Sequence, residues 1–301
     1  MTTIAFLGLG HMGLPMAKNL QSAGRHVIGF DVVPAALDAA REAGIEVAAS
    51  GPDAAARADV VLTMFPSGRH VIDAYRGSDT VPGLLTVAAP GTLFIDSSTI
   101  AVDEARAAHE LADAAGFHSL DAPVSGGVVG AENATLAFMV GGSDEDFQAA
   151  LPLLETMGRR IVHCGGPGLG QAAKVCNNMI LAISQIAVAE AFVLGERLGL
   201  THQALFDVAS NASGQCWALT TNCPVPGPVP TSPANRDYQP GFAGALMSKD
   251  LGLALQAIES TGADAKLGRH AQEIYAAFAA GDGAGQDFSG IINTIRADSA
   301  A

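Results

Sequence analysis

The sequence predicts an α/β protein in which a doubly wound, mainly parallel sheet is followed by an all-helical C-terminal domain. Two observations support this fold class. Over roughly the first 165 residues, short apolar runs alternate with segments of helical spacing, the pattern of βαβ units with helices on both faces of a sheet. After Gly170 the strand-like runs end and a long apolar helical stretch begins. We therefore expect one domain at 1–165 and a second at 166–301.

The N-terminal elements follow from local patterns. Gly24 closes the first helical segment and Pro34 opens the second, as expected of a helix C-terminus and a first helical turn. Apolar runs predict strands and helical spacing predicts the segments between them. Strands are expected at 4–7, 27–30, 60–64, 93–96, 118–120, 136–140 and 160–163, and helices at 14–23, 34–43, 69–75 and 102–115.

In the C-terminal part, helices are expected from 171 to 198 and at 201–209, 246–260 and 267–279. The segment 224–240 holds six of the 15 prolines and should lack regular structure. The run 179–194 is strongly apolar, but polar residues interrupt it, so we expect a buried helix and not a membrane span. Because that helix is apolar almost all round, it should pack against more than one partner. This predicts a homodimer or homotetramer formed through the helical domain.

Composition excludes several classes of function. The net charge is −14 and only 15% of residues are charged, so a nucleic-acid-binding surface is not expected. An acidic substrate would need local cations or amide groups to capture it. Cys164, Cys176, Cys216 and Cys223 form no Cys-x-x-Cys pair and have no histidine at metal-ligand spacing. We expect reduced thiols, no metal and a cytoplasmic protein, because the N-terminus lacks the basic region of a signal peptide.

A glycine-rich turn follows the first predicted strand and opens the first helix. It comprises Gly8, Leu9, Gly10, His11, Met12 and Gly13. In a strand–turn–helix context this spacing is typical of a Rossmann-type dinucleotide site, where the helix N-terminus faces a pyrophosphate. Asp31 ends the second strand, where a carboxylate can bind the ribose hydroxyls or simply form a turn. No arginine follows it, so the sequence favours NAD over NADP.

Two further loops follow strands at the edge where open α/β sheets bind ligands, and a separate glycine-rich turn is a third candidate segment. They are 63–68, 96–99 and 121–127. In the second, taken alone, Ser98 or Thr99 is better explained as simply the N-cap of the next helix. In the third, Ser125, Gly126 and Gly127 offer a hydroxyl and unobstructed backbone, which suit a carboxylate, although an ordinary Gly-Gly turn is an equal alternative.

Lys174 is one of four lysines and stands at the start of the longest apolar run. A buried charge is unfavourable without a partner, so its position calls for a reason. Asn178 follows at i+4 and shares its helix face, which gives an amine beside an amide. The alternative is a lysine at a helix end whose amine reaches the solvent.

Four segments together resemble the β-hydroxyacid dehydrogenase family in order and spacing, over nearly the whole chain to about Phe288. These segments are 8–13, 121–127, 168–178 and 249–250, and the segments 213–217, 224–227 and 246–251 support them. The resemblance implies reversible, NAD-dependent oxidation of 3-hydroxyisobutyrate to methylmalonate semialdehyde, a step of valine catabolism. Gln215 stands where an arginine is common in close relatives.

The resemblance also assigns roles to residues. Lys174 resembles the family's catalytic lysine, which acts as general acid/base. Ser125, Gly126 and Gly127 resemble its substrate-binding turn, and Asn178 resembles a second residue that contacts the substrate or orients the lysine. Trp217 and Phe242 are candidates for packing around the substrate methyl group, or are plain core. Phe65, Pro66, Thr99 and Lys249 resemble positions that contact the dinucleotide.

Two alternatives remain from the sequence. One is an enzyme for another small β-hydroxyacid, such as a tartronate semialdehyde reductase. The other is a non-catalytic dinucleotide-binding module, whose mark would be a lost lysine; Lys174 is present.

Overall fold

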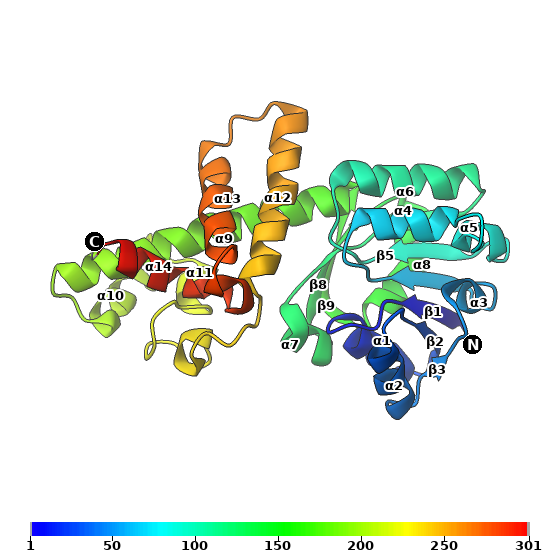
Figure 1. Ribbon diagram of the computed structural model, residues 1–301, viewed down its shortest axis with the longest axis horizontal. Coiled ribbons are helices and arrows are strands. Elements are labelled where there is room, and N and C mark those ends of the chain that lie inside the picture. The colour runs from blue at the N-terminus through cyan, green and yellow to red at the C-terminus, as the bar shows by residue number, and fades with distance from the viewer. Residues whose placement is uncertain (1, 300–301) are drawn as a thin grey trace. The chain divides into compact units, whose positions relative to one another are not determined.

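The first part of the chain is built on a nine-stranded sheet in the computed structural model, which describes residues 2–299 (Figure 1). The strand order is β3-β2-β1-β4-β5-β6-β8-β7, with β9 beside β8. Pairing is parallel from β3 to β6, antiparallel where β8 meets β6 and β7, and parallel between β8 and β9. The strands are β1 (Thr3–Leu7), β2 (His26–Phe30), β3 (Glu46–Val47), β4 (Val60–Thr63), β5 (Leu93–Asp96), β6 (His118–Asp121), β7 (Val124–Ser125), β8 (Leu136–Gly141) and β9 (Gly158–Gly165).

Helices cover both faces of this sheet because its strands are apolar on both sides. In β1, Ile4 and Phe6 join one buried cluster, whereas Ala5 and Leu7 join another. Figure 1 shows α1 and α2 on one face and α4 and α6 on the other. The helices are α1 (Gly13–Ser22), α2 (Pro34–Glu42), α3 (Gly51–Ala55), α4 (Gly68–Arg76), α5 (Leu84–Val87), α6 (Val102–Ala114), α7 (Gly127–Glu132) and α8 (Asp144–Leu154).

The register brings the carboxyl ends of the parallel strands to one edge. Leu7 pairs with Phe30 and Thr63, Thr63 with Asp96, and Asp96 with Asp121. The loops that begin after these residues therefore all emerge along the same edge, which is where open α/β sheets bind ligands.

The chain divides into two compact units, Met1–Lys174 and Val175–Ala301. Helix α9 (Leu169–Arg197) begins in the first and continues into the second. The described part of the second unit consists of helices, loops and one isolated bridge between Ala243 and Asp287. Its other helices are α10 (His202–Ala209), α11 (Trp217–Thr220), η1 (Pro233–Arg236), α12 (Gly244–Thr261), α13 (Lys266–Ala279), η2 (Asp282–Gly285), η3 (Phe288–Gly290) and α14 (Ile291–Asp298).

The expected fold class, a mainly parallel α/β sheet followed by helices, is confirmed. The proline-rich segment differs in one detail, because it contains the short 3-10 helix η1. Helix α9 has the length and mean hydropathy to cross a membrane, but half of its most apolar window is buried within the fold. Core helices of globular proteins have the same composition.

Candidate functional site

The glycine loop between β1 and α1 is shaped partly by the fold itself. Gly8 has φ of 97°, and a Cβ there would overlap the carbonyl oxygen of Met64. A Cβ on Gly13 would overlap the carbonyl oxygen of Gly8. Gly10 is exposed, and a Cβ there would meet no atom within 4 Å. Within residues 2–299, no atom obstructs a side chain at position 10, whereas a pyrophosphate lying against the backbone would. The loop therefore fits a dinucleotide.

The other members of the loop divide between core and surface. Leu9 is buried, Met12 is half-buried against the core, and His11 is exposed. The backbone N–H of Leu9 donates to Asp31 Oδ2 at 2.7 Å, and that of Val33 donates to Asp31 Oδ1 at 2.8 Å. Asp31 thus closes the loop against the end of β2. Each carboxylate oxygen retains a second lone pair with which it can accept a ribose hydroxyl.

The loops after β4 and β5 are joined by a chain of hydrogen bonds. The backbone N–H of Phe65 donates to Ser98 Oγ at 2.7 Å, and Ser98 Oγ donates to Asp96 Oδ1 at 2.6 Å. Phe65 and Thr99 are half-buried and Pro66 is exposed, all beyond the carboxyl ends of the strands. The N-cap of α6 is Ala101, so neither Ser98 nor Thr99 caps that helix.

Asp96 is the most perturbed carboxyl group near these loops. Burial raises its pKa from 3.8 to about 6, although hydrogen bonds from Ser98 and Thr63 act in the opposite direction. The nearby charge of Asp121 raises the pKa further. Asp96 supports both loops. It accepts the backbone N–H of Ser98 directly, and it reaches the backbone of Phe65 through the Ser98 hydroxyl.

Lys174 lies beside the Ser-Gly-Gly turn. Its Nζ donates a hydrogen bond to the carbonyl oxygen of Val124 at 2.9 Å, and the side chain is buried. Lys174 therefore does not extend to solvent as a lysine at a helix end would. Val124 immediately precedes Ser125, where β7 ends; Gly126 and Gly127 follow with φ of 133° and 62°, values that favour glycine. The structure thus brings Lys174 and Ser125–Gly127 together.

In the second unit, Asn178 is buried, and its Nδ2 donates to Asp250 Oδ2 at 2.5 Å. Asp250 lies on α12, next to the half-buried Lys249. Phe242 is half-buried and packs edge to face on Phe288, with ring centroids 5.8 Å apart. Trp217 opens α11 and is 52% exposed, so its ring is not part of the core.

Sequence reasoning did not assign roles to four residues that support the site. They are Asp96, Asp121, Gln171 and Asp250, all buried. All four lie in segments that the sequence singled out, 96–99, 121–127, 168–178 and 249–250. A polar residue beside or within an apolar run was the signal available for them. Among residues 2–299, no three His, Cys, Asp or Glu side chains are grouped to hold a metal ion.

Two family models together match nearly the whole chain. The NAD binding domain of 6-phosphogluconate dehydrogenase matches residues 3–166, and the family described as NAD-binding of NADP-dependent 3-hydroxyisobutyrate dehydrogenase matches residues 168–295. NAD is therefore the cofactor class to which this chain's loops correspond.

Curated relatives match over almost their full length. A probable 3-hydroxyisobutyrate dehydrogenase of Mycobacterium tuberculosis is 60% identical, with 99% of each chain covered. An NAD-dependent L-serine dehydrogenase of Pseudomonas aeruginosa is 46% identical, with 96% of each covered. A solved structure of the Mycobacterium tuberculosis 3-hydroxyisobutyrate dehydrogenase with L-serine has a TM-score of 0.94 and 60% identity, covering 98% of this chain and 99% of that one.

Proposed function

We propose that this chain oxidises 3-hydroxyisobutyrate to methylmalonate semialdehyde. It belongs to the 3-hydroxyisobutyrate dehydrogenase group of the β-hydroxyacid dehydrogenase family, whose members are NAD-binding oxidoreductases. This reaction is a step of valine catabolism. The observation that supports it most directly is the hydrogen bond from Lys174 Nζ to Val124 O, which holds an amine beside the Ser125–Gly127 turn. Close relatives named for this activity match the chain from end to end.

In the proposed mechanism, NAD supplies the hydride acceptor when it is bound. Lys174 accepts the substrate hydroxyl proton during oxidation and returns it during reduction, as a general acid/base. Only the neutral amine can accept a proton, so the oxidation starts from that form. The Val124 carbonyl orients the amine.

The substrate carboxylate is proposed to bind the Ser125, Gly126 and Gly127 turn, with Asn178 as a second contact. Support comes from the burial of Asn178 and its fixed orientation on Asp250. Trp217 and Phe242 are proposed to contact the substrate methyl group. The half-exposed indole of Trp217 supports this, because a large apolar side chain outside the core is available to a ligand.

The dinucleotide is proposed to contact the glycine loop, the Asp31 carboxylate and the loops after β4 and β5. The open space at Gly10 and the carboxylate beside Leu9 support this placement. Because Asp31 would repel a 2′-phosphate, NAD should be preferred over NADP. The proposed contact residues are Gly8, Leu9, Gly10, His11, Met12, Gly13, Asp31, Phe65, Pro66, Thr99 and Lys249.

L-Serine is a second candidate substrate. It is also a β-hydroxyacid, and one relative is named for its oxidation while a solved relative was determined with it. Measuring kcat/KM on 3-hydroxyisobutyrate, L-serine, glycerate and 3-hydroxypropionate separates the candidate substrates. A reductive assay with tartronate semialdehyde tests the alternative of a tartronate semialdehyde reductase. We expect the highest kcat/KM for 3-hydroxyisobutyrate; a higher value for another substrate would reassign the enzyme.

Replacing the lysine tests the mechanism. K174A should bind NADH normally but lose turnover by about 100- to 10,000-fold, the contribution typical of a general acid/base. K266A is the matched control, because Lys266 is 84% exposed and pairs only with Asp264 in the ion pairs described. A folded K174A that binds NADH and turns over normally would contradict the mechanism. Absence of hydride transfer by the wild type with every substrate would favour a non-catalytic module.

Assembly and location are separate proposals. Five large apolar side chains on the helices and turns of the second unit are at least 60% exposed, which supports a homodimer or homotetramer. They are Ile180, Leu194, Leu198, Val208 and Leu267. A monomer in sedimentation at micromolar concentration would contradict it. The four cysteines are free thiols, which supports a cytoplasmic location, and fractionation of the cells tests it.

A further inference from the structure

The first turn of α9 is anchored to a buried carboxylate at the end of β6. Asp121 Oδ1 accepts the backbone N–H of Gly168 at 2.8 Å, and Oδ2 accepts that of Gln171 at 2.8 Å. Amides at a helix start have no partner within the helix, so a carboxylate there satisfies them and interacts favourably with the helix dipole. A Cβ added to Gly141 or Gly170 would overlap Asp121, so the helix start is packed directly against this residue.

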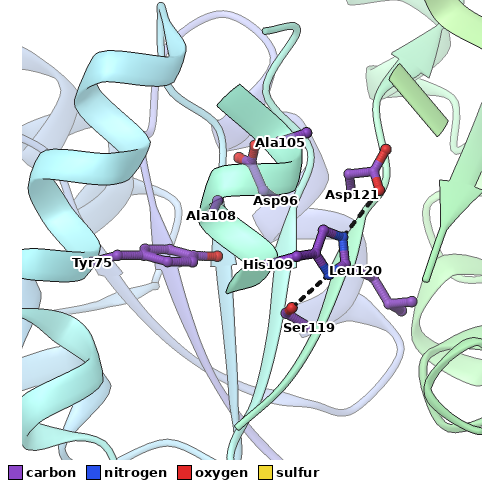
Figure 2. A pocket seen from close by; sticks show the side chains of 8 residues that line it. All are labelled: Tyr75, Asp96, Ala105, Ala108, His109, Ser119, Leu120 and Asp121. Carbon is purple, nitrogen blue, oxygen red and sulfur yellow. Dashed lines mark hydrogen bonds and ion pairs between the residues drawn. The ribbon is translucent and has the colours of Figure 1, made fainter. Parts of the chain in front are cut away.

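His109 contacts the Asp121 carboxylate, and Ser119 in turn contacts His109, as Figure 2 shows. His109 Nε2 lies 3.1 Å from Asp121 Oδ1, and Ser119 Oγ lies 2.8 Å from His109 Nδ1. The order Ser–His–Asp has the appearance of a nucleophilic triad. However, Ser119 lies within strand β6, and both carboxylate oxygens accept backbone amides, from Gly168 just before α9 and from Gln171 in its first turn. The arrangement therefore serves to fix Asp121.

The Asp121 carboxylate lies at the start of two segments that set the position of Lys174. One is α9, which carries Lys174, and the other leads to Val124, which accepts its hydrogen bond. Along the helix, Lys174 follows Gln171 by three residues, about one turn. Along the chain, Val124 at the start of β7 follows Asp121 at the end of β6 by three residues, and its carbonyl accepts the hydrogen bond from Lys174 Nζ at 2.9 Å. A shift of Asp121 relative to α9 would therefore move the donor and its acceptor with respect to each other.

Gln171 adds a second anchor to the same helix turn. Its Nε2 donates to the Ser98 carbonyl at 2.7 Å, and its Oε1 accepts the Ile100 N–H at 3.2 Å. The residue is fully buried. The turn that precedes Lys174 is thus tied both to β6 and to the loop after β5, which carries Thr99.

We propose that Asp121 is a positioning residue for Lys174, and that His109 holds the Asp121 carboxylate in the orientation that binds α9. The inference rests on the proposed function, because it gives Asp121 a role only through the lysine. Asp121 fixes Lys174 Nζ relative to Val124 and the Ser125–Gly127 turn. Misplacement of a catalytic group by an ångström can lower the rate about 100-fold, so the positioning has a measurable effect.

The test is D121N, because asparagine keeps one acceptor oxygen but presents an NH₂ group to one of the two backbone amides that Asp121 binds. We expect kcat to fall by about 10- to 100-fold. The dissociation constant for NADH, measured by fluorescence, should stay within about twofold, since misplacing the lysine leaves the glycine loop unchanged. In the double variant with K174A, D121N should cause no further loss, because a residue that acts through the lysine has nothing left to position.

S143A is the matched control for loss of a helix cap. Ser143 Oγ accepts the Asp146 N–H at the start of α8, in the same unit but on another helix. S143A should lower the melting temperature with unchanged kcat, whereas D121N should lower kcat in the fully folded protein. Normal turnover by folded D121N, or a further loss on adding it to K174A, would overturn the inference. Normal turnover by K174A would instead overturn the proposed function.

If D121N does not fold, variants of His109 decide the question. Glutamine can place an N–H near the position of Nε2 and leucine cannot. We expect H109L to lower kcat several-fold without weakening NADH binding, and H109Q to retain most of the activity. Equal, wild-type turnover by H109L and H109Q would overturn the inference.

Discussion

Asp96 in the first unit and Asp287 in the second are both buried carboxylates, but their hydrogen-bonding environments differ. Asp287 Oδ1 accepts from Asn222 Nδ2 at 3.1 Å, from Ser289 N at 3.0 Å and from Ser289 Oγ at 2.7 Å. Its Oδ2 accepts from the backbone N–H groups of Gly241 and Phe242 at 3.0 and 3.1 Å. Both oxygens are engaged, and the carboxylate joins three segments of the helical unit.

Asp96 has partners on one oxygen only. Oδ1 accepts from Thr63 Oγ1, Ser98 Oγ and Ser98 N at 2.7, 2.6 and 3.1 Å. Within residues 2–299, Oδ2 is buried and has no hydrogen-bond partner. The Asp96 residue lines a small pocket, shown in Figure 2, together with Tyr75, Ala105, Ala108, His109, Ser119, Leu120 and Asp121.

The difference shows two uses of a buried charge. Asp287 compensates its burial with five donors and stabilises a loop arrangement. Asp96 is compensated in part, and burial raises its pKa to about 6. The first unit therefore retains an unfavourable charge next to the loops that carry Phe65 and Thr99, the loops proposed to contact the dinucleotide.

The largest effect should follow from removing the saturated carboxylate. D287A leaves five donors without their acceptor, and we expect a loss of about 3–5 kcal/mol in the free energy of unfolding. D287N keeps an acceptor at Oδ1 and should lose less. Urea unfolding followed by circular dichroism measures both. If D287A and D287N have equal midpoints near that of the wild type, Asp287 does not have the stabilising role that its contacts indicate.

The second effect should have the opposite sign and depend on pH. Between about pH 4 and 6 the folded protein holds a proton on Asp96 that the unfolded chain has lost, so this group's contribution to stability falls as pH rises through that window. A folded-state pKa of about 6 in place of 3.8 corresponds to about 3 kcal/mol of destabilisation above pH 7.

D96N removes this titration while its amide oxygen can keep the three bonds made to Oδ1. We expect the stability of D96N relative to the wild type to rise between pH 4 and pH 7, as measured by urea unfolding at each pH. The other carboxyl groups titrate in both proteins, so their contributions cancel in the difference. Parallel stability curves for the two proteins would show that Asp96 is not destabilised by its ionisation.

Local sequence patterns predicted much of the fold and part of the site. Strand and helix periodicity located β1, β2, β4 and β5, and the register of these strands placed their loops on one edge. The glycine loop, Asp31 and Lys174 followed from short-range spacing. Each of these features depends on neighbours within a few residues, which is the distance over which residue patterns carry information.

The remaining features depend on contacts between distant residues. Asp121 binds Gln171 across 50 positions, and Asn178 binds Asp250 across 72. No local sequence pattern predicts hydrogen bonds between residues so far apart in the chain. The antiparallel placement of β8 against β6 was equally outside what periodicity can indicate. Helix α8 was not among the expected helices, although local signals for it exist. Ser143 is its N-cap, and three acidic residues stand in its first turn.

The smallest effect concerns a carboxylate that is fully paired but partly exposed. Glu196 accepts from Arg296 through both oxygens, and hydrogen bonding to Arg296, with a further bond from His202, lowers the pKa of Glu196. A lowered pKa contributes stability above the unfolded value of 4.5, and this contribution is lost as pH falls. Because the pair is about 30% exposed, E196Q should lose only about 0.5–1 kcal/mol at pH 7 and less at pH 3.

D38N is the matched control for E196Q, because Asp38 and Arg41 form an ion pair that is more than half exposed. It should change the unfolding midpoint by less than E196Q does, since solvent screens the interaction more effectively. Equal effects of E196Q and D38N at pH 7 would mean that pairing geometry does not distinguish the two sites. In that case the number of donors would not predict how much a carboxylate contributes to stability, and D287N should then be as destabilising as D287A.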